Sequence, residues 1–366
     1  MGEFSTEVRT TQGGVFLERL TPESGEWERG NPTGEKTHVF RLGDHDGLSR
    51  ADRRELFQPR TRMITVCWNG QPICHRPIRN LSFDITTEKL TVTHEDIRAR
   101  ILRRYLWGVG HMTPQSVFDW RGYSTRGVAR QVLYYALVHP YSAAWPLNVD
   151  VGGAELGSSP WAQYFAYDGQ TAGDILSDIE DIGPDIELEP EFRNGAAWWA
   201  ARIGTPHLTG PAYELPLRAA PTSGAAPAPG SLVGAQVVHD GSEMATGAFA
   251  VGRGSEQDQR IGQAALPETV PVSADYIVPY REIDDQAHLD ALALAWVQSH
   301  AGPRVQWSTD VLTQDIPPSE LRIGSILTAL IDQTSPWLDP GIVRRRVIGY
   351  SGTTESAQYS LVLEPL

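Results

Sequence analysis

Apolar and polar residues alternate along much of the first hundred positions, a pattern that predicts antiparallel β-strands. The strongest case is MITVCWNGQPI, residues 63–73, in which β-branched and aromatic residues stand on both sides of Asn69-Gly70. Both central positions of a type I′ turn need positive φ, and an Asn-Gly pair adopts it readily. The pattern therefore predicts a tight β-hairpin at this point of the chain.

The alternation continues in LSFDITTEKLTV, which places Leu81, Phe83 and Ile85 on one face of a strand. With the hairpin before it, this segment predicts that residues 35–110 form a small antiparallel β-barrel or sandwich. Residues 1–34 are polar and rich in turn-formers, and we expect an N-terminal arm or the first strands there.

The period changes to that of a helix in YSTRGVARQVLYYALVHP, where Ser124 or Thr125 can cap the first turn. A second, shorter helix is predicted after Thr171, and DIELEPEF then alternates as a strand. A helix that leads into a strand through a glycine turn is typical of a small α/β insertion. We place this insertion at residues 111–218.

The composition shifts at AAPTSGAAPAPG, residues 219–230, which has too little apolar side chain to bury and predicts an exposed linker or a disordered loop. The strand-like SLVGAQVVHD comes next, and a glycine-rich stretch follows it. We therefore expect residues 219–270 to be a linker and mobile loop with one or two strands.

The strongest helical pattern is IDDQAHLDALALAWVQSH, in which Ile283, Leu289, Leu292 and Trp296 form an apolar stripe. Four strand-like runs complete the sequence: RVQWSTDVL, LRIGSILTALI, GIVRRRVIGYSG and QYSLVLEPL. Residues 271–366 are thus predicted to form a helix plus a second small β-barrel. The expected fold class is mainly β with α/β insertions.

The charge balance restricts the kinds of partner. With 45 acidic and 31 basic residues the net charge is -14, which argues against nucleic-acid binding through a basic surface. No stretch approaches the roughly 20 apolar residues of a transmembrane helix, and the first residues lack a secretion signal, so we expect a soluble protein made in the cytoplasm. Cys67 and Cys74 fit the two arms of the hairpin, and we expect them to be buried free thiols.

Two polar runs were weighed as candidate sites. His94-Glu95-Asp96 offers metal-capable side chains, but sequence neighbours diverge on a strand or helix, so we expect a solvated strand-to-helix joint. The acidic run 174–191 could suggest a paired-carboxylate hydrolase or a calcium site, yet its acids alternate with Ile and Leu as on a solvated face. Nucleotide-binding and serine-hydrolase motifs are not found, and we predict no catalytic, metal or cofactor residues.

Aromatic and basic residues offer contacts rather than chemistry. Trp161, Trp198 and Trp199 lie in turn-rich or Ala/Gly-rich sequence, where an aromatic face could meet a sugar ring or a partner protein, although core packing is the alternative for each. Arg344-Arg345-Arg346 lies in a strand-like run and suggests an interfacial or acid-paired strand face.

The order of these pieces resembles a known family. The segment RMITVCWNGQPICHRPIRNLSFDITTEKLTVTHEDI comes first, then TAGDILSDI running into DIELEPEF, then HLDALALAWVQ, LRIGSIL and RRRVIGYSGTTESAQYSLVLEP. This order is similar to that of minor tail proteins of long-tailed phages that infect actinobacteria, of the baseplate or tail-hub type. The likeness covers roughly residues 35–366.

The resemblance implies a structural virion protein with two related β-barrels, assembled as a homotrimer at the tail tip after synthesis in the host cytoplasm. It implies that the chain joins the tail tube to the tip, beside the distal tail protein and the tail-tip or tape-measure proteins. No cofactor and no catalytic residue follow from it. The alternatives are a carbohydrate-binding module for a cell-wall glycan and a cell-wall hydrolase that uses the 174–191 carboxylates.

Overall fold

The computed structural model describes most of the chain, as two compact units. Unit 1 comprises residues 1–235 and 309–364, and unit 2 comprises residues 236–308. The predicted linker 219–230 and Trp161 lie outside the described residues, which are 2–30, 34–42, 49–108, 110–139, 146–159, 163–181, 183–216, 232–254, 256–266, 274–280, 283–331 and 338–366.

Strands from both ends of the chain share one sheet. The first seven are β1 (Phe4–Thr10), β2 (Phe16–Leu20), β3 (Ser24–Arg29), β4 (Glu35–Arg41), β5 (Arg62–Trp68), β6 (Gln71–Asp84) and β7 (Lys89–Glu95), with helix α1 (Arg50–Leu56) between β4 and β5. The later six are β13 (Ala212–Pro216), β14 (Val233–Asp240), β18 (Arg304–Leu312), β19 (Ile326–Ile331), β20 (Gly341–Thr353) and β21 (Gln358–Pro365). The fold is therefore mainly β, as predicted, and the four C-terminal strands are confirmed.

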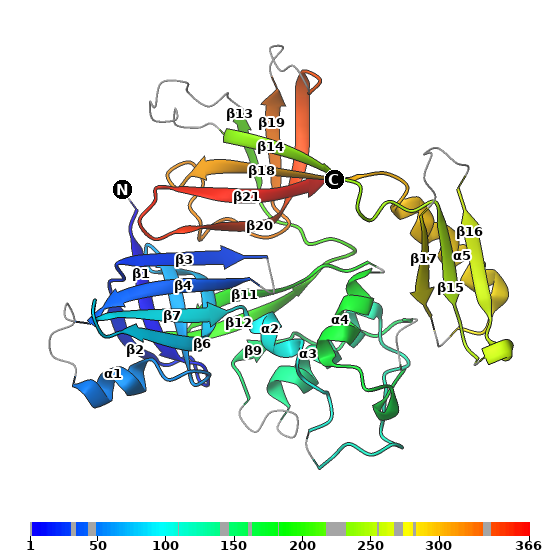
Figure 1. Cartoon of the computed structure of the whole chain (residues 1–366), viewed down its shortest axis with the longest axis horizontal. Helices are drawn as coiled ribbons and strands as arrows, with labels where there is room; N and C mark the ends of the chain where they lie inside the picture. The colour runs from blue at the N-terminus through cyan, green and yellow to red at the C-terminus, as the bar shows by residue number, and fades with distance from the viewer. Residues whose placement is uncertain are drawn as a thin grey trace. The chain divides into compact units, whose positions relative to one another are not determined.

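The sheet order shows how the two sets of strands meet. It runs β14-β18-β21-β20-β3-β4-β7-β6-β5-β1-β2, and β19 pairs with both β13 and β20. The junction is the antiparallel pair β3–β20, in which Tyr350 is opposite Arg29 (Figure 1). The path has two ends, β14 and β2, that do not pair with each other among the described strands, so closure into two barrels stays a prediction.

The predicted hairpin is confirmed between β5 and β6. Asn69 has φ 50° and Gly70 has φ 77°, the two positive values that a type I′ turn requires. Cys67 and Cys74 lie on its two arms, and both are buried and free, as expected. Burial raises the pKa of the Cys67 thiol to about 12 and that of Cys74 to about 11, so neither is a ready nucleophile.

The insertion has its own apolar core. Helix α3 (Thr125–Leu133) begins at Ser124, whose hydroxyl accepts from the Gly127 amide, and continues as the π-helix η2 (Tyr134–Val138). Thr171 caps α4 (Ala172–Asp181) in the same way, so both predicted helices are confirmed. The other elements are β8 (Val117–Asp119), β9 (Val149–Asp150), β10 (Gln163–Phe165), η3 (Ala166–Asp168), β11 (Ile186–Arg193) and β12 (Ala196–Ile203). Helix α2 (Ile97–Ile101) precedes the insertion and shares its apolar core.

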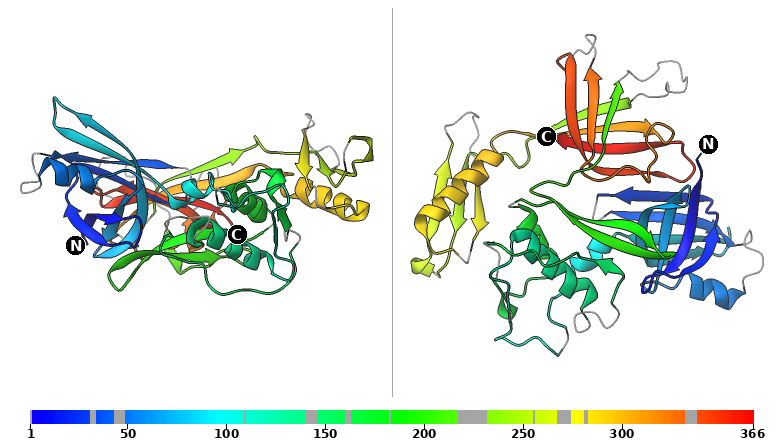
Figure 2. Two further views of the ribbon diagram at one scale, coloured as in Figure 1. Left: turned by 90° about the horizontal axis from the view of Figure 1, so that it is seen from below. Right: turned by 180° about the vertical axis from the view of Figure 1, so that it is seen from behind.

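Unit 2 is a small α/β layer pair. Its sheet, in the order β16-β15-β17, is covered on one face by a helix (Figure 2). The elements are β15 (Gly247–Val251), η4 (Glu256–Asp258), β16 (Ile261–Ala265), β17 (Asp275–Pro279) and α5 (Gln286–Ser299). With β14, the described part of residues 219–270 holds three strands, where the sequence suggested one or two.

The buried stripe of α5 differs from the predicted one. Leu289, Ala293 and Val297 are buried, whereas Leu292 and Trp296 are only partly buried. The buried residues follow one another at intervals of four, so the buried face is turned relative to the predicted one. It includes Ala293, whereas the prediction considered only large apolar side chains. The backbone of β16 approaches the helix closely at Leu289, where a Cβ on Gly262 would lie 2.3 Å from the Leu289 carbonyl carbon.

Replacing Gly127 by alanine tests the packing of the insertion. A Cβ at this position would lie 2.2 Å from the carbonyl oxygen of Glu155. At a solvent-exposed helix position, alanine stabilises the helix by about 1 kcal/mol relative to glycine. Here the backbone must move to make room for the Cβ, so we expect Gly127→Ala to lower the free energy of unfolding by about 1–3 kcal/mol. Urea unfolding measures the change. The control Gly153→Ala, with no atom within 4 Å, should change it by less than about 0.5 kcal/mol.

Candidate functional site

A network of mostly buried charges, with Arg322 at its exposed edge, lies where the insertion meets the large sheet. Glu187 and Glu189 are two residues apart on β11 and so share a face. Arg202 Nη1 lies 2.8 Å from Glu187 and its Nε lies 3.4 Å from Glu189. Arg322 Nε lies 3.0 Å from Glu189, and Arg29 pairs closely with Glu187. We call these five residues the arginine–glutamate network.

Arg29 is the most buried member, with a side chain 6% exposed. Burial alone would lower the pKa of its guanidinium, but Glu187 and Glu189 raise the pKa above its usual value, so the group stays charged. Its Nη1 also donates to the Tyr350 hydroxyl at 2.8 Å, which in turn donates to the carbonyl of Leu321 at 2.7 Å. One guanidinium thus connects β3, β11 and β20.

A second charged cluster extends the network at the N-terminal end of β11. Arg346 Nη1 lies 2.8 Å from Asp185 and the same side chain pairs with Glu364. The other contacts of Asp185 are with the loop after β12: it accepts from the Leu208 amide at 2.9 Å, and His207 Nδ1 lies 3.4 Å away. The acid-paired strand face predicted for the three consecutive arginines is confirmed at Arg346.

The acidic run 174–191 is the expected solvated face on α4, where Asp174 is exposed, but not on β11, where Glu187 is buried. Glu180 pairs with Arg98, whose Nη1 lies 2.9 Å away. Glu187 and Glu189 form ion pairs within the arginine–glutamate network. Asp174 accepts from the Thr171 amide at 2.8 Å and so completes a helix cap. Apolar alternation could not reveal this, because Arg98, Arg29 and Arg322 are distant in sequence from the acids that they pair with. Within the described residues, no group of three or more His, Cys, Asp or Glu could hold a metal ion.

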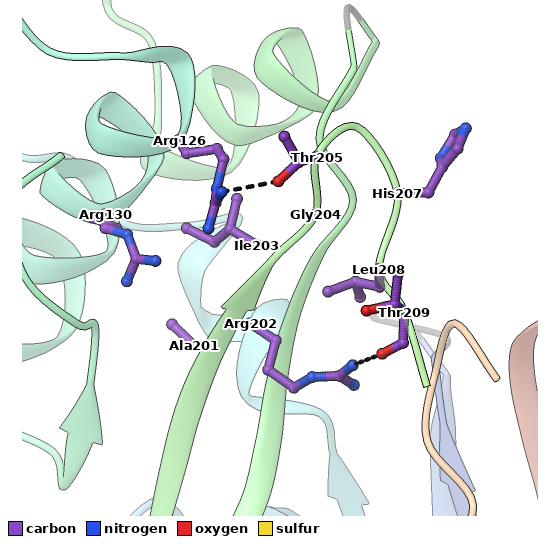
Figure 3. A pocket seen from close by; sticks show the side chains of 10 residues that line it. All are labelled: Arg126, Arg130, Ala201, Arg202, Ile203, Gly204, Thr205, His207, Leu208 and Thr209. Atoms are coloured by element: carbon purple, nitrogen blue, oxygen red, sulfur yellow. Dashed lines mark hydrogen bonds between the residues drawn. The ribbon is translucent and has the colours of Figure 1, made fainter. Parts of the chain in front are cut away.

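An open groove of about 390 Å³ lies next to this network (Figure 3). Helix α3, the end of β12 and the loop after it line the groove with Arg126, Arg130, Ala201, Arg202, Ile203, Gly204, Thr205, His207, Leu208 and Thr209. The lining is mostly cationic and polar.

The arginines of the groove already have partners within the chain. Arg126 Nη1 donates to Thr205 Oγ1 at 2.8 Å, and its Nε lies 3.5 Å from Glu155. Arg130 Nη1 donates to the carbonyl of Val151 at 2.5 Å. These contacts hold the side chains in fixed positions, so the groove offers a firm polar surface and has little unpaired charge for capturing an anion.

The His94-Glu95-Asp96 run is a strand-to-helix joint, as expected, but it is not solvated. Asp96 caps α2 by accepting from the Arg98 amide at 2.8 Å. His94 is fully buried: Arg76 Nε donates to its Nδ1 at 3.1 Å, and its Nε2 lies 2.8 Å from His38 Nδ1. Since Nδ1 of His94 accepts, its proton is on Nε2 and points to His38. The expectation failed because the side chains that contact His94, His38 on β4 and Arg76 on β6, come from strands that are distant in sequence.

The tryptophans occupy different environments. Trp199 is 1% exposed and its ring packs edge-on against His75, with centroids 5.6 Å apart. Trp198, its neighbour on β12, is partly exposed, and the Arg193 guanidinium lies 5.0 Å above its ring. Strand alternation explains the difference, since consecutive side chains point to opposite faces.

None of the described helices is both long and apolar enough to span a membrane.

Comparison with known proteins identifies similar folds. No protein-family model and no curated protein sequence matches the chain. Among solved structures, the 43 kDa tail protein of prophage MuSo2 from Shewanella oneidensis has a TM-score of 0.58 at 10% identity, over 100% of this chain and 98% of that one. The tail protein from Neisseria meningitidis MC58 has a TM-score of 0.56 at 12% identity, over 99% and 96%.

A third structure, a chain of the Francisella PdpA-VgrG complex, has a TM-score of 0.54 at 8% identity, over 100% of this chain and 58% of that one. The structural neighbours are thus mainly phage tail proteins, the group that the order of sequence elements resembled. At these identities the likeness shows a shared fold.

Neutralising Glu187 should destabilise unit 1 strongly. Glu187→Gln leaves Arg29 buried without its closest carboxylate, and we expect the free energy of unfolding to fall by about 3 kcal/mol or more. The control is Glu55→Gln, because Glu55 is 74% exposed and pairs with Arg62 at 3.3 Å, a contact worth less than about 1 kcal/mol. Urea unfolding of both variants makes the comparison, and similar small losses would contradict a central role for the network.

Acid should destabilise the chain through its buried histidines. Burial lowers the pKa of His38 and of His75 from 6.5 to about 3. Above pH 6.5 both folded and unfolded states are neutral; between pH 6.5 and 3 only the unfolded state binds the proton, so each residue removes stability by up to about 1.4 kcal/mol per pH unit as the pH falls.

The contribution of one histidine can be isolated. Carboxylates also titrate in acid, so the test compares the wild-type chain with His75→Gln in urea at pH 7, 6, 5 and 4. The variant should be less stable at pH 7, because His75 is hydrogen-bonded to Thr65 and to the carbonyl of Glu191. It should then lose less stability on acidification. Parallel pH profiles for the two proteins would count against a buried neutral His75.

Proposed function

We propose that this chain is a structural subunit of a phage tail, of the tail-hub type. The observation that carries the proposal is the fold, which matches two phage tail proteins over nearly their full length and nearly all of this chain. A match of this extent includes the strands, the insertion and unit 2, and so is more informative than a match to one common motif.

The finer features of the proposal come from the resemblance of the sequence. They are two β-barrels, a homotrimer, a place at the tail tip between the tube and the tip proteins, an actinobacterial host for a long-tailed phage, and synthesis in the host cytoplasm. The partners would be the distal tail protein and the tail-tip or tape-measure proteins.

Exposed apolar residues at the ends of two long hairpins support an assembling role. On β6, Phe83 is 48% exposed, and Ile85, just beyond the strand, is 84% exposed. On the hairpin of β19 and β20, Leu330 and Ile342 are paired across the strands and are 56% and 71% exposed. Clustered exposed apolar side chains of this kind are typical of surfaces that other proteins cover.

The proposed role is non-enzymatic. In the run 174–191, Glu180, Glu187 and Glu189 are committed to ion pairs with arginines, Asp174 caps α4, and Asp178 accepts from the Gln170 amide at 3.2 Å. A glycosidase acid instead needs a carboxyl group that is free to exchange a proton with the substrate. Of the tryptophans singled out by sequence, Trp198 is the one we propose as a partner contact, since its ring is partly exposed.

Labelling of phage particles tests this function. An antibody against the chain, seen by negative-stain microscopy, should mark the distal end of the tail, and mass photometry of the purified chain should detect a trimer. The double variant Phe83→Asp with Ile85→Asp should abolish the tail label, because charge on the hairpin end would prevent docking. The control Leu156→Asp alters a leucine that is 77% exposed outside both hairpins and should keep the label.

The possible outcomes differ clearly. Label at the tail end that depends on the hairpin residues supports the hub reading. Label distributed along the tube would favour a tube protein, and particles without label would overturn the tail function itself.

A further inference from the structure

A short two-stranded ribbon in the insertion has one buried and one open face. Strands β8 and β10 pair so that Phe118 is opposite Tyr164 and Val117 is opposite Phe165. Side chains alternate along each strand, so Phe118 and Tyr164 share one face and Val117 and Phe165 share the other. Tyr164 is 3% exposed, whereas Val117 is 45% exposed. The open face is therefore on the side of Val117.

Aromatic packing fixes the ribbon from its buried side. The ring of Phe118 has its centroid 4.6 Å from Tyr135, 4.9 Å from Trp107 and 5.1 Å from Trp120. Trp120 in turn packs on Tyr164 at 5.6 Å. A strand pair held by so many large rings keeps its outer face in place, which reduces the entropy lost when a ligand binds.

The outer face carries two stacked aromatic rings. Phe165, on β10, and Tyr167, in η3, have ring centroids 5.1 Å apart and planes inclined by 18°. Tyr167 is 66% exposed. The pair presents an aromatic surface to solvent.

Planar polar groups lie next to these rings on the same face. Asp119 is opposite Gln163 in the ribbon and accepts from its amide at 3.2 Å. Arg121 Nε donates to both Asp119 oxygens, at 2.9 and 3.0 Å, and the Arg121 side chain is 71% exposed. These hydrogen bonds lower the pKa of Asp119 to about 2, so its carboxylate remains an acceptor. The three groups hold one another in position while their outer edges face water.

This combination matches the two kinds of surface on a sugar. A pyranose ring has a face of C–H groups, which packs against an aromatic ring, and an edge of hydroxyls, which pair with planar carboxylate, guanidinium and amide groups. An anionic ligand is disfavoured by Asp119, and a purely apolar partner would leave the polar trio without new hydrogen bonds. The features therefore select a neutral ligand with an apolar face and many hydroxyls.

We propose that the open face of the β8–β10 ribbon binds a neutral oligosaccharide, with one sugar ring stacked on Tyr167 and hydroxyls bound by Asp119, Arg121 and Gln163. We call these residues, with Phe165 and Val117, the ribbon face. The shallow outer surface suits a chain of several sugars that lies along it. This site is different from the tryptophans considered from sequence, and it holds whether or not the chain is a tail subunit.

Soluble β1→4-linked oligosaccharides provide the test. The full-length chain is titrated with cellohexaose and with chitohexaose by calorimetry, and saturation-transfer NMR identifies which sugar protons touch the protein. We expect saturable binding of at least one of them, with the strongest transfer to the ring C–H protons. Tyr167→Ala should weaken binding about tenfold or more, whereas Tyr167→Phe, which keeps the ring, should change it less than about threefold.

Two further variants distinguish specific sugar binding at the ribbon face from non-specific binding and from misfolding. Arg121→Ala should weaken binding through the polar trio without removing a ring. Tyr105→Ala removes an exposed ring outside the ribbon face and outside both hairpins, since Tyr105 is 45% exposed, and it should bind like the wild type. Because Tyr167 and Arg121 are largely exposed, the urea midpoints of their variants should equal that of the wild type.

Three results would overturn the proposal. They are no saturable binding of either sugar, equal binding by Tyr167→Ala and the wild type, and an equal loss in Tyr105→Ala. If Tyr167→Ala instead leaves sugar binding intact but removes the chain from phage particles, the ribbon face is a protein contact. Failure of sugar binding leaves the tail label unchanged, so the two proposals are tested separately.

Discussion

The buried ion pair between Arg29 and Glu187 is the constraint on which the arrangement of unit 1 depends. Arg29 lies on β3, the strand that pairs with β20, and Glu187 lies on β11 in the insertion. Three segments far apart in the sequence therefore meet at one guanidinium. Two buried charges gain little stability over apolar packing, but either one alone is very costly. The pair thus acts mainly on specificity: only the arrangement that brings all three segments together satisfies both charges.

The buried interactions fix the interior of unit 1, and the exposed apolar residues lie at the ends of its hairpins. The arginine–glutamate network and the aromatic core of the insertion fix β11 and the β8–β10 ribbon. The exposed apolar residues, by contrast, lie at hairpin ends such as Phe83 and Leu330. Such a division favours association, because a contact surface that is already ordered loses less entropy when a partner covers it.

Local signals in the sequence were sufficient for many elements. Asn69-Gly70 identified its hairpin, Ser124 and Thr171 identified helix starts, and alternation identified the last four strands, because each depends on neighbours within a few residues. The partners of Glu187 and the burial of His94 could not be predicted, since they depend on strands brought together from distant parts of the chain. Alternation reveals that two faces differ, but not which face another strand will cover. In α5 the small residue Ala293 replaced a large one in the buried stripe, for the same reason.

The ribbon face could not be predicted from the sequence either, because it depends on the pairing of two strands that are distant in sequence. Once that pairing is known, the chemistry of the face is informative. In the sequence no motif connects Val117 and Asp119 with Phe165. The pairing of β8 with β10 places them together and removes Phe118 and Tyr164 to the core. The hairpin ends of β6 and β19 expose aliphatic side chains and a single phenyl ring, which suits protein contacts. The ribbon face combines stacked rings with a rigid polar trio, and a surface that is half aromatic and half hydrogen-bonding complements a sugar better than it complements either a protein core or an ion.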